Sequence, residues 1–273
     1  MTGPVQALDH VVVAVADLEL ATAAYETLLG RRAEITAPAQ GARRAWVRLA
    51  NMALEIIAPD GEGPAGDRVR AHLAGSGEGL MALAFSTQDL GEAKRVLARR
   101  GVTAEPSYGG ALFATAEATS GVPMVFVEAA SHPVSEPTAG AGVVQALDHV
   151  VINTPNPDRA VALYGARLGL DLRLDRSNPQ WGSRLMFFRC DGAVVEVAAS
   201  LTAPVSDAPD RLSGLAWRVA EPEAARERLA AAGFDVSEVR QGRKPGTHVF
   251  TVRSGAPGAP SLMLSADPAL EEA

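Results

Sequence analysis

Apolar and polar residues follow one order four times along the chain. An apolar strand leads into an amphipathic helix, and about three short strands separated by Gly, Pro or Asn come next. In the first block, the stretches 8–15, 32–36, 44–49 and 52–58 have the length of strands, whereas 18–29 has the spacing of an amphipathic helix. This order predicts four βαβββ modules.

The ends of the predicted helices support this division. The apolar stretch 80–86 leads into a helix at 90–100, and 215–219 leads into one at 222–232. Each of the four predicted helices is closed by a glycine, which accepts the left-handed conformation common after a helix: Gly30, Gly101, Gly169 and Gly233.

The two halves of the chain are internal repeats. The segment ALDHVV at 7–12 recurs at 146–151, an offset of 139 residues, and a tyrosine follows each histidine by 15 positions (Tyr25 and Tyr164). Leu54-Glu55-Ile56 then corresponds to Val195-Glu196-Val197. A duplication of this length predicts two domains of the same fold.

The predicted fold is α+β, with the four modules paired into two tandem domains. A module with its helix on one face of a curved sheet needs a second module or a ligand on the other face, so we expect cupped mixed sheets. The boundaries are a first domain at 1–130 (modules about 7–60 and 78–130), a linker at 131–144, and a second domain at 145–273 (modules about 145–200 and 211–267).

These features resemble the vicinal oxygen chelate superfamily, which includes glyoxalase I, the bleomycin-resistance proteins, methylmalonyl-CoA epimerase and the extradiol dioxygenases. The resemblance rests on both Leu-Asp-His-Val-Val openings, on the helix pattern from Ala24-Tyr25 to Leu29-Gly30, and on two strand motifs at 77–85 and 121–128. It covers nearly the whole chain. It implies the paired βαβββ fold and an activity on small organic molecules with vicinal oxygens.

The resemblance also implies a metal site in each half. In the family, a His on the first strand and a Glu on the last strand of one module hold a divalent metal together with ligands from a second module. His10 and Glu55 match these positions in the first half, as do His149 and Glu196 in the second. Such donors suit Fe, Mn, Zn, Ni or Co. Without a metal, Glu55 or Glu196 would act as a general base beside its His.

The other modules depart from the family pattern. Ala82 and Val125 stand where the second module would supply its His and Glu, and Gly214 and Met263 stand there in the fourth module. Two donors then remain where three or four normally hold a catalytic metal. The sequence is therefore compatible with a divalent metal and with no cofactor. A simpler interpretation is that each His and Glu are buried polar groups that hydrogen-bond to one another.

Several further residues are candidates for a substrate pocket: Trp46, Trp181, Phe187, His248 and Phe250. Pockets for small molecules are mostly apolar and contain a few polar groups. The aromatic residues could equally pack in the hydrophobic core, and His248 could lie exposed on an edge strand. His72 falls on a short helical stretch. The segment 61–66 fits the spacing Gly-x-Gly-x-x-Gly, but it lies outside a parallel βαβ repeat, so we do not predict a dinucleotide site there.

Composition limits the classes of binding partner. The chain has 47% hydrophobic and 21% charged residues, which is typical of a globular protein. Its net charge of -7 disfavours nucleic acid as a partner, because nucleic-acid-binding proteins present a basic surface. A single cysteine, Cys190, and the absence of a basic leader or long apolar run favour a cytoplasmic protein without a membrane anchor. A homodimer is possible, because open sheets leave edges to cover.

Two functions follow as hypotheses. The first is a glyoxalase- or dioxygenase-like enzyme, a lyase, isomerase or dioxygenase, that acts through a divalent metal or through proton transfer by His and Glu. The alternative is a metal-free small-molecule binding or resistance protein of the bleomycin-resistance type. A third interpretation is that one half only supports the other.

Overall fold

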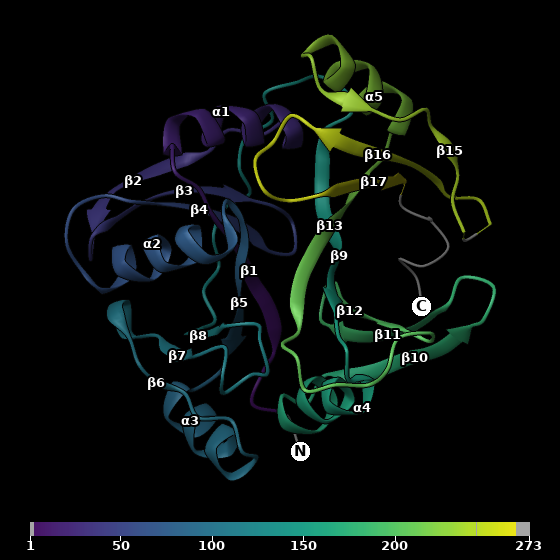
Figure 1. Ribbon diagram of the computed structural model, residues 1–273. Coiled ribbons are helices and arrows are strands. Elements are labelled where there is room, and N and C mark those ends of the chain that lie inside the picture. The colour runs from purple at the N-terminus through teal and green to yellow at the C-terminus, as the bar shows by residue number, and fades with distance from the viewer. Residues whose placement is uncertain (1–2, 244, 266–273) are drawn as a thin grey trace. The chain divides into compact units, whose positions relative to one another are not determined.

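The computed structural model describes residues 3–243 and 245–265 of the 273-residue chain (Figure 1). The chain ends and Lys244, including the last part of the predicted fourth module, lie outside the described residues. The strands form two mixed sheets, one in each half of the sequence.

The first sheet has the strand order β2-β3-β4-β1-β5-β8-β7-β6. β5 and β8 pair in parallel, whereas β2, β3 and β4 pair in an antiparallel ribbon. The strands are β1 (Ala7–Ala14), β2 (Glu34–Ala39), β3 (Ala42–Arg48), β4 (Ala53–Pro59), β5 (Gly79–Thr87), β6 (Glu105–Pro106), β7 (Leu112–Ala114) and β8 (Met124–Glu128).

The second sheet repeats this plan in the order β10-β11-β12-β9-β13-β17-β16-β14, with β15 paired to β16. β9 pairs in parallel with β12, and β13 pairs in parallel with β17. The strands are β9 (Val144–Asn153), β10 (Asp171–Asn178), β11 (Ser183–Cys190), β12 (Ala193–Ser200), β13 (Arg211–Val219), β14 (Asp235–Val236), β15 (Arg240–Gln241), β16 (His248–Ser254) and β17 (Ser261–Ser265).

The helices are α1 (Leu18–Leu29), α2 (Pro64–Ser76), α3 (Leu90–Arg99), α4 (Pro157–Ala160) and α5 (Pro222–Ala231), with a 3₁₀ turn η1 (Tyr108–Gly110) and a π-helix η2 (Val161–Arg167). None of the helices within residues 3–243 and 245–265 combines the length and the apolar character that a membrane crossing requires. The element order confirms the predicted α+β fold of four βαβββ modules.

Helix α1 shows how local sequence sets an element. Its bounds are those predicted, because Asp17 caps the first turn by accepting a hydrogen bond from the Leu20 amide at 2.9 Å, and Gly30 takes a left-handed φ of 66° at the end. α2 is longer than the short stretch expected around His72. The helix after β9 departs further, since α4 passes directly into the π-helix η2.

The described part of the chain divides into two compact units. Of the described residues, unit 1 comprises 3–12, 81–131 and 149–213, and unit 2 comprises 13–80, 132–148, 214–243 and 245–265. Because these units cut across both sheets, the domain boundaries placed around residues 131–144 stay a prediction.

In unit 2, the ribbon of β3 and β4 lies between two helices. α1 and α2 both pack on β3 and β4, and Figure 1 shows these strands between the two helices. The α1 side is marked by the ion pair of Arg43 with Glu19, so the alternating neighbour Arg44 points to the α2 side. Val69 of α2 has no exposed surface.

Three glycines let α2 begin close to the β2–β3 turn. Gln40 and Gly41 both have positive φ, at 57° and 76°, as a tight hairpin turn requires. A Cβ on Gly66 would lie 1.9 Å from the Gly41 carbonyl oxygen, and one on Gly63 would lie 2.4 Å from the Gln40 carbonyl carbon. The glycine spacing at 61–66 therefore serves close backbone packing.

This contact gives a stability prediction. Gly66→Ala forces the α2 N-terminus away from the turn, and we expect the free energy of unfolding in urea to fall by about 1–3 kcal/mol, as for other overpacked sites. The matched control is Gly75→Ala in the same helix, where a Cβ meets no atom within 4 Å. That variant should be unchanged or more stable by about 0.5–1 kcal/mol. Equal effects of the two substitutions would contradict the packing role.

Candidate functional site

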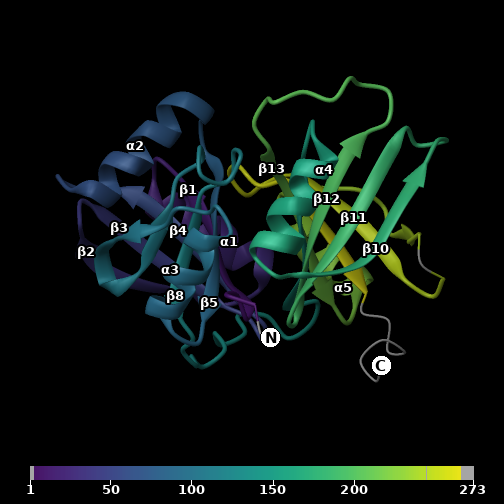
Figure 2. The ribbon, with the colours of Figure 1, turned by 90° about the horizontal axis from the view of Figure 1, so that it is seen from below.

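In unit 1, the strands β9, β11 and β12 have one closed and one partly open face. Burial alternates along them: Val150, Ile152, Met186, Phe188, Val195 and Val197 have no exposed surface, and the residues between them are largely half-exposed. The rings of Tyr164 in η2 and Phe188 lie 5.8 Å apart, so the π-helix covers the closed face. Figure 2 shows α4 in front of these strands.

The predicted pair His149 and Glu196 lies on the partly open face. His149 Nε2 is 3.3 Å from Glu196 Oε2, and the two side chains are 17% and 14% exposed. The parallel register places His149 beside Val194, two positions before Glu196, so both side chains leave the sheet on the same side. The structure therefore brings these two predicted site residues together.

The surroundings of this pair are apolar. Phe187 stands directly opposite Glu196 on β11, Leu174 stands opposite Phe187 on β10, and Val151 is the partner of Glu196 on β9. Directly opposed residues project to the same face. A carboxylate and an imidazole beside aliphatic and aromatic side chains can orient a small molecule and move a proton at one of its polar atoms.

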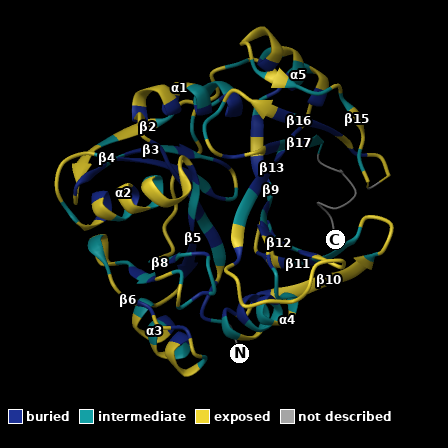
Figure 3. Cartoon of the chain, viewed as in Figure 1, coloured by how far each residue is buried: buried dark blue, intermediate teal, exposed yellow. Residues whose placement is uncertain are grey.

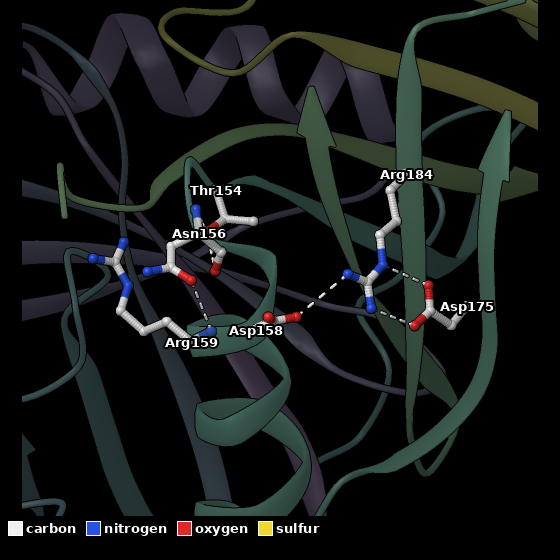
Figure 4. A network of polar contacts seen from close by, with 6 residues as sticks. All are labelled: Thr154, Asn156, Asp158, Arg159, Asp175 and Arg184. Atoms are coloured by element: carbon white, nitrogen blue, oxygen red, sulfur yellow. Dashed lines mark hydrogen bonds and ion pairs between the residues drawn. The ribbon is translucent and has the colours of Figure 1, made fainter. Parts of the chain in front are cut away.

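Polar contacts on the other side of the sheet fix the β10–β11 ribbon to α4. Arg184 donates two hydrogen bonds to Asp175, at 2.9 and 2.7 Å, and one of 3.4 Å to Asp158 (Figure 4). The hydrogen bond from Arg184 holds the pKa of Asp175 below its usual range. Asn156 caps α4 by accepting from the Arg159 amide at 3.1 Å.

A second polar cluster holds the segment 201–210 beside the start of α4. The buried Asp210 accepts hydrogen bonds from Thr154 Oγ1 at 2.6 Å and from Arg159 at 2.7 Å, and Arg159 also donates to the Ala208 carbonyl at 2.7 Å. Burial raises the pKa of Tyr164 far above its ordinary value, and the negative charge of Asp210 adds to this effect. Residues 201–209 are exposed, whereas Asp210 at the end of the segment is buried.

The first half differs at the corresponding position. Glu55 is 5% exposed, and Arg44 donates a hydrogen bond of 2.7 Å from Nε to Glu55 Oε1. His10 is also buried, and its Nδ1 lies 2.6 Å from Asp9 Oδ1. By strand register Arg44 corresponds to Leu185 in the second half, since Arg44 pairs with Ile57 and Leu185 with Ala198. The sequence alone did not identify Arg44 as the partner of Glu55. Its position two residues before Trp46 on the same strand was a signal, because residues two apart on a strand share a face.

The described residues do not fit the metal site that the resemblance implies. They contain no group of three or more His, Cys, Asp and Glu side chains placed to hold a metal ion. In the first half a guanidinium group already binds the expected carboxylate ligand. In the second half His149 and Glu196 supply two donors, one fewer than catalytic zinc sites usually take from the protein. We therefore derive no chemical step through a metal.

The positions where the family ligands are replaced lie on the central strands of both sheets. Ala82 and Val125 belong to β5 and β8, and Gly214 and Met263 belong to β13 and β17. Ala82 and Met263 are buried. A Cβ on Gly214 would already lie 3.1 Å from the Pro260 carbonyl oxygen, so there is little room for a larger side chain.

The remaining pocket candidates take different places. Trp46 is half-buried opposite Glu55, with the Arg48 guanidinium 5.8 Å from its ring. Trp181 is 49% exposed at the β10–β11 turn, and His248 is exposed at the start of β16. Phe250 has no exposed surface, so it packs as a core residue. Of these five candidates, Phe187 is the one that pairs directly with Glu196 in the described sheet register.

Comparisons with known proteins agree with this architecture. A model described as "Glyoxalase-like domain" matches residues 8–133, and one described as "Glyoxalase/Bleomycin resistance protein/Dioxygenase superfamily" matches residues 148–251. The chain therefore belongs to the glyoxalase, or vicinal oxygen chelate, superfamily and contains two tandem domains of this type. The resemblance stated from the sequence is confirmed.

Solved structures show the same fold at low sequence identity. A mutant of 4-hydroxymandelate synthase from Streptomyces coelicolor has a TM-score of 0.73 at 15% identity, covering 97% of this chain and 93% of that one. A xylose isomerase-like TIM barrel/4-hydroxyphenylpyruvate dioxygenase fusion protein has a TM-score of 0.67 at 15% identity, covering 97% of this chain and 50% of that one. No curated protein matches the chain in sequence.

The buried pair of the first half gives a second stability prediction. Arg44→Met removes the cation that binds Glu55 and should lower the free energy of unfolding by about 3–5 kcal/mol, as for other buried ion pairs broken on one side. The double variant Arg44→Met, Glu55→Leu should recover much of this loss. A double-mutant cycle in urea measures the coupling, and additive effects would contradict a structural ion pair.

Proposed function

We propose that the protein is an enzyme of the superfamily that acts on a small oxygen-bearing organic molecule at the β9–β12 face, with His149 and Glu196 as a proton-transfer pair. The observation that carries this proposal is the partly open His149–Glu196 pair, whereas Glu55 is buried and bound by Arg44. The named structural relatives include a synthase and a dioxygenase, which favours an enzyme over a purely structural role.

The chemistry follows from the two side chains. Glu196 would accept a proton from a carbon next to a carbonyl, and His149 would hold or donate a proton at the substrate oxygen. Phe187 and Leu174 would exclude water from one side of the substrate and strengthen these polar interactions. Substrates with adjacent hydroxyl and carbonyl groups, or with adjacent carbonyl and carboxylate groups, offer both an acidic carbon and an oxygen to bind.

The second candidate function is a metal-free binding or resistance protein of the bleomycin-resistance type. The replaced ligand positions Ala82, Val125, Gly214 and Met263 favour it, because a binding cup needs no metal. The exposed apolar residues near the same strands would then hold a ligand without turnover: Leu174, Trp181 and Leu201.

Deuterium exchange distinguishes these functions. A panel of α-hydroxy ketones, α-hydroxy acids and α-keto acids is incubated with the protein in D₂O, and proton NMR follows the loss of the C–H signal with and without a chelator. We expect exchange of at least one compound to be insensitive to the chelator. Glu196→Gln should slow it by about 10²–10⁴-fold, the usual contribution of a positioned general base.

Glu55→Gln is the matched control, since it changes the corresponding residue of the other half and keeps a hydrogen-bond acceptor for Arg44. It should retain exchange. Equal loss in both variants would contradict the assignment to the second half, and loss on chelation would show that a metal takes part. Tight binding without exchange would establish the binding function instead.

A further inference from the structure

One arginine lies on the same face of the sheet as the His149–Glu196 pair. Arg189 of β11 is exposed next to the outermost strand β10, which is itself exposed over most of its length (Figure 3). The two residues that flank Arg189 in β11 are buried, so its side chain leaves the sheet on the partly open side. Val194 of β12 is the direct partner of both Arg189 and His149. Arg189 is also the diagonal neighbour of Glu196, which places the two residues about 7–8 Å apart, within reach of a long side chain.

The first half shows what holds an arginine at this position. Arg48 of β3 corresponds to Arg189, because each lies two residues after the aromatic residue that is opposite the Glu of its half. Arg48 Nη1 donates a hydrogen bond of 2.6 Å to Glu34 Oε2 on β2, and its guanidinium group lies 5.8 Å from the centre of the Trp46 ring. A carboxylate of the protein itself therefore neutralises Arg48.

The second half keeps the arginine and has a leucine in the place of Glu34. Leu174 on β10 stands where Glu34 stands on β2, since each is opposite the aromatic residue of its half. The β10 residue directly opposite Arg189 is Asp171, whose Oδ2 atom forms an ion pair of 2.7 Å with Arg173 Nε. Among residues 3–243 and 245–265, none forms a hydrogen bond or an ion pair with the Arg189 guanidinium group. Its charge is therefore available to a ligand on the open face.

We propose that Arg189 binds a carboxylate group of the substrate at a distance from the reacting carbon, so that the substrate of this site is an organic acid. This inference rests on the proposed function, because it names the substrate class of the same site. The planar guanidinium group offers two parallel N–H donors, which match the two oxygens of a carboxylate. With Glu196 at the acidic carbon and Arg189 at the carboxylate, the apolar side chain of Phe187 would contact the short carbon chain between them.

Binding in the absence of turnover tests this assignment. Glu196→Gln removes the proposed base, and NMR titration of this variant measures the dissociation constants of α-hydroxy ketones whose chains, of different lengths, end in a carboxylate, and of their uncharged methyl esters. We expect the best carboxylate to bind about 10- to 100-fold more tightly than its ester, the range of a hydrogen bond to a charged group. Arg189→Gln added to this variant should abolish the preference. Thermal unfolding should barely change, because Arg189 is exposed.

Two further variants test the position of the charge. Arg176→Gln is the matched control, since it removes another exposed arginine, on β10 opposite Leu185, and it should keep the preference for carboxylates. Leu174→Glu supplies a carboxylate at the position that Glu34 has in the first half. It should lower the preference about tenfold although Arg189 is still present, because the new carboxylate competes for the guanidinium group.

The outcomes separate this inference from the proposed function. Carboxylate binding that depends on Arg189, together with no deuterium exchange in the wild-type protein, would support the carboxylate site and contradict the proton-transfer pair. Equal binding of carboxylates and esters, no detectable binding of either, or an equal loss of preference in Arg189→Gln and Arg176→Gln would overturn the role of Arg189.

Discussion

A sheet that carries its helices on one face must bury its other face in some different way, and this constraint governs both halves of the chain. In unit 2 the α2 helix packs against β3 and β4, and glycines at its start bring it close to the preceding turn. In unit 1 the corresponding segment 201–210 forms no helix and is held beside the start of α4 by Asp210. The face with His149 and Glu196 therefore stays partly open.

The same pair of positions has acquired two electrostatic environments. Glu55 is buried, and its carboxylate accepts a hydrogen bond from the Arg44 guanidinium. In the second half Leu185 stands at the corresponding register position, and Glu196 Oε2 lies 3.3 Å from His149 Nε2. The two carboxylates thus differ in the side chain at the corresponding position of the neighbouring strand, which is Arg44 beside Glu55 and Leu185 beside Glu196.

Much of this architecture could be predicted from local patterns. The duplicated openings, the period of the helices and the closing glycines predicted four modules, and α1 was placed at its observed bounds by Asp17 and Gly30. The His149–Glu196 pair was also predictable, because its two residues lie on adjacent strands of a repeated motif. The length of α2 and the π-helix η2 were not, since both depend on what packs against them.

The sequence by itself determined the modules, the family and the repeated His and Glu positions, because periodicity, caps and repeats can be recognised along the chain. Only the tertiary structure decided that Glu196 lies near His149 on a partly open face, whereas Glu55 is buried and bound by Arg44. The partners of Glu55 and Glu196 come from β3 and β11 through strand register, and the exposure of each pair depends on how distant segments cover the sheet. Burial and ion pairing are properties of neighbours in space, which a single sequence does not reveal.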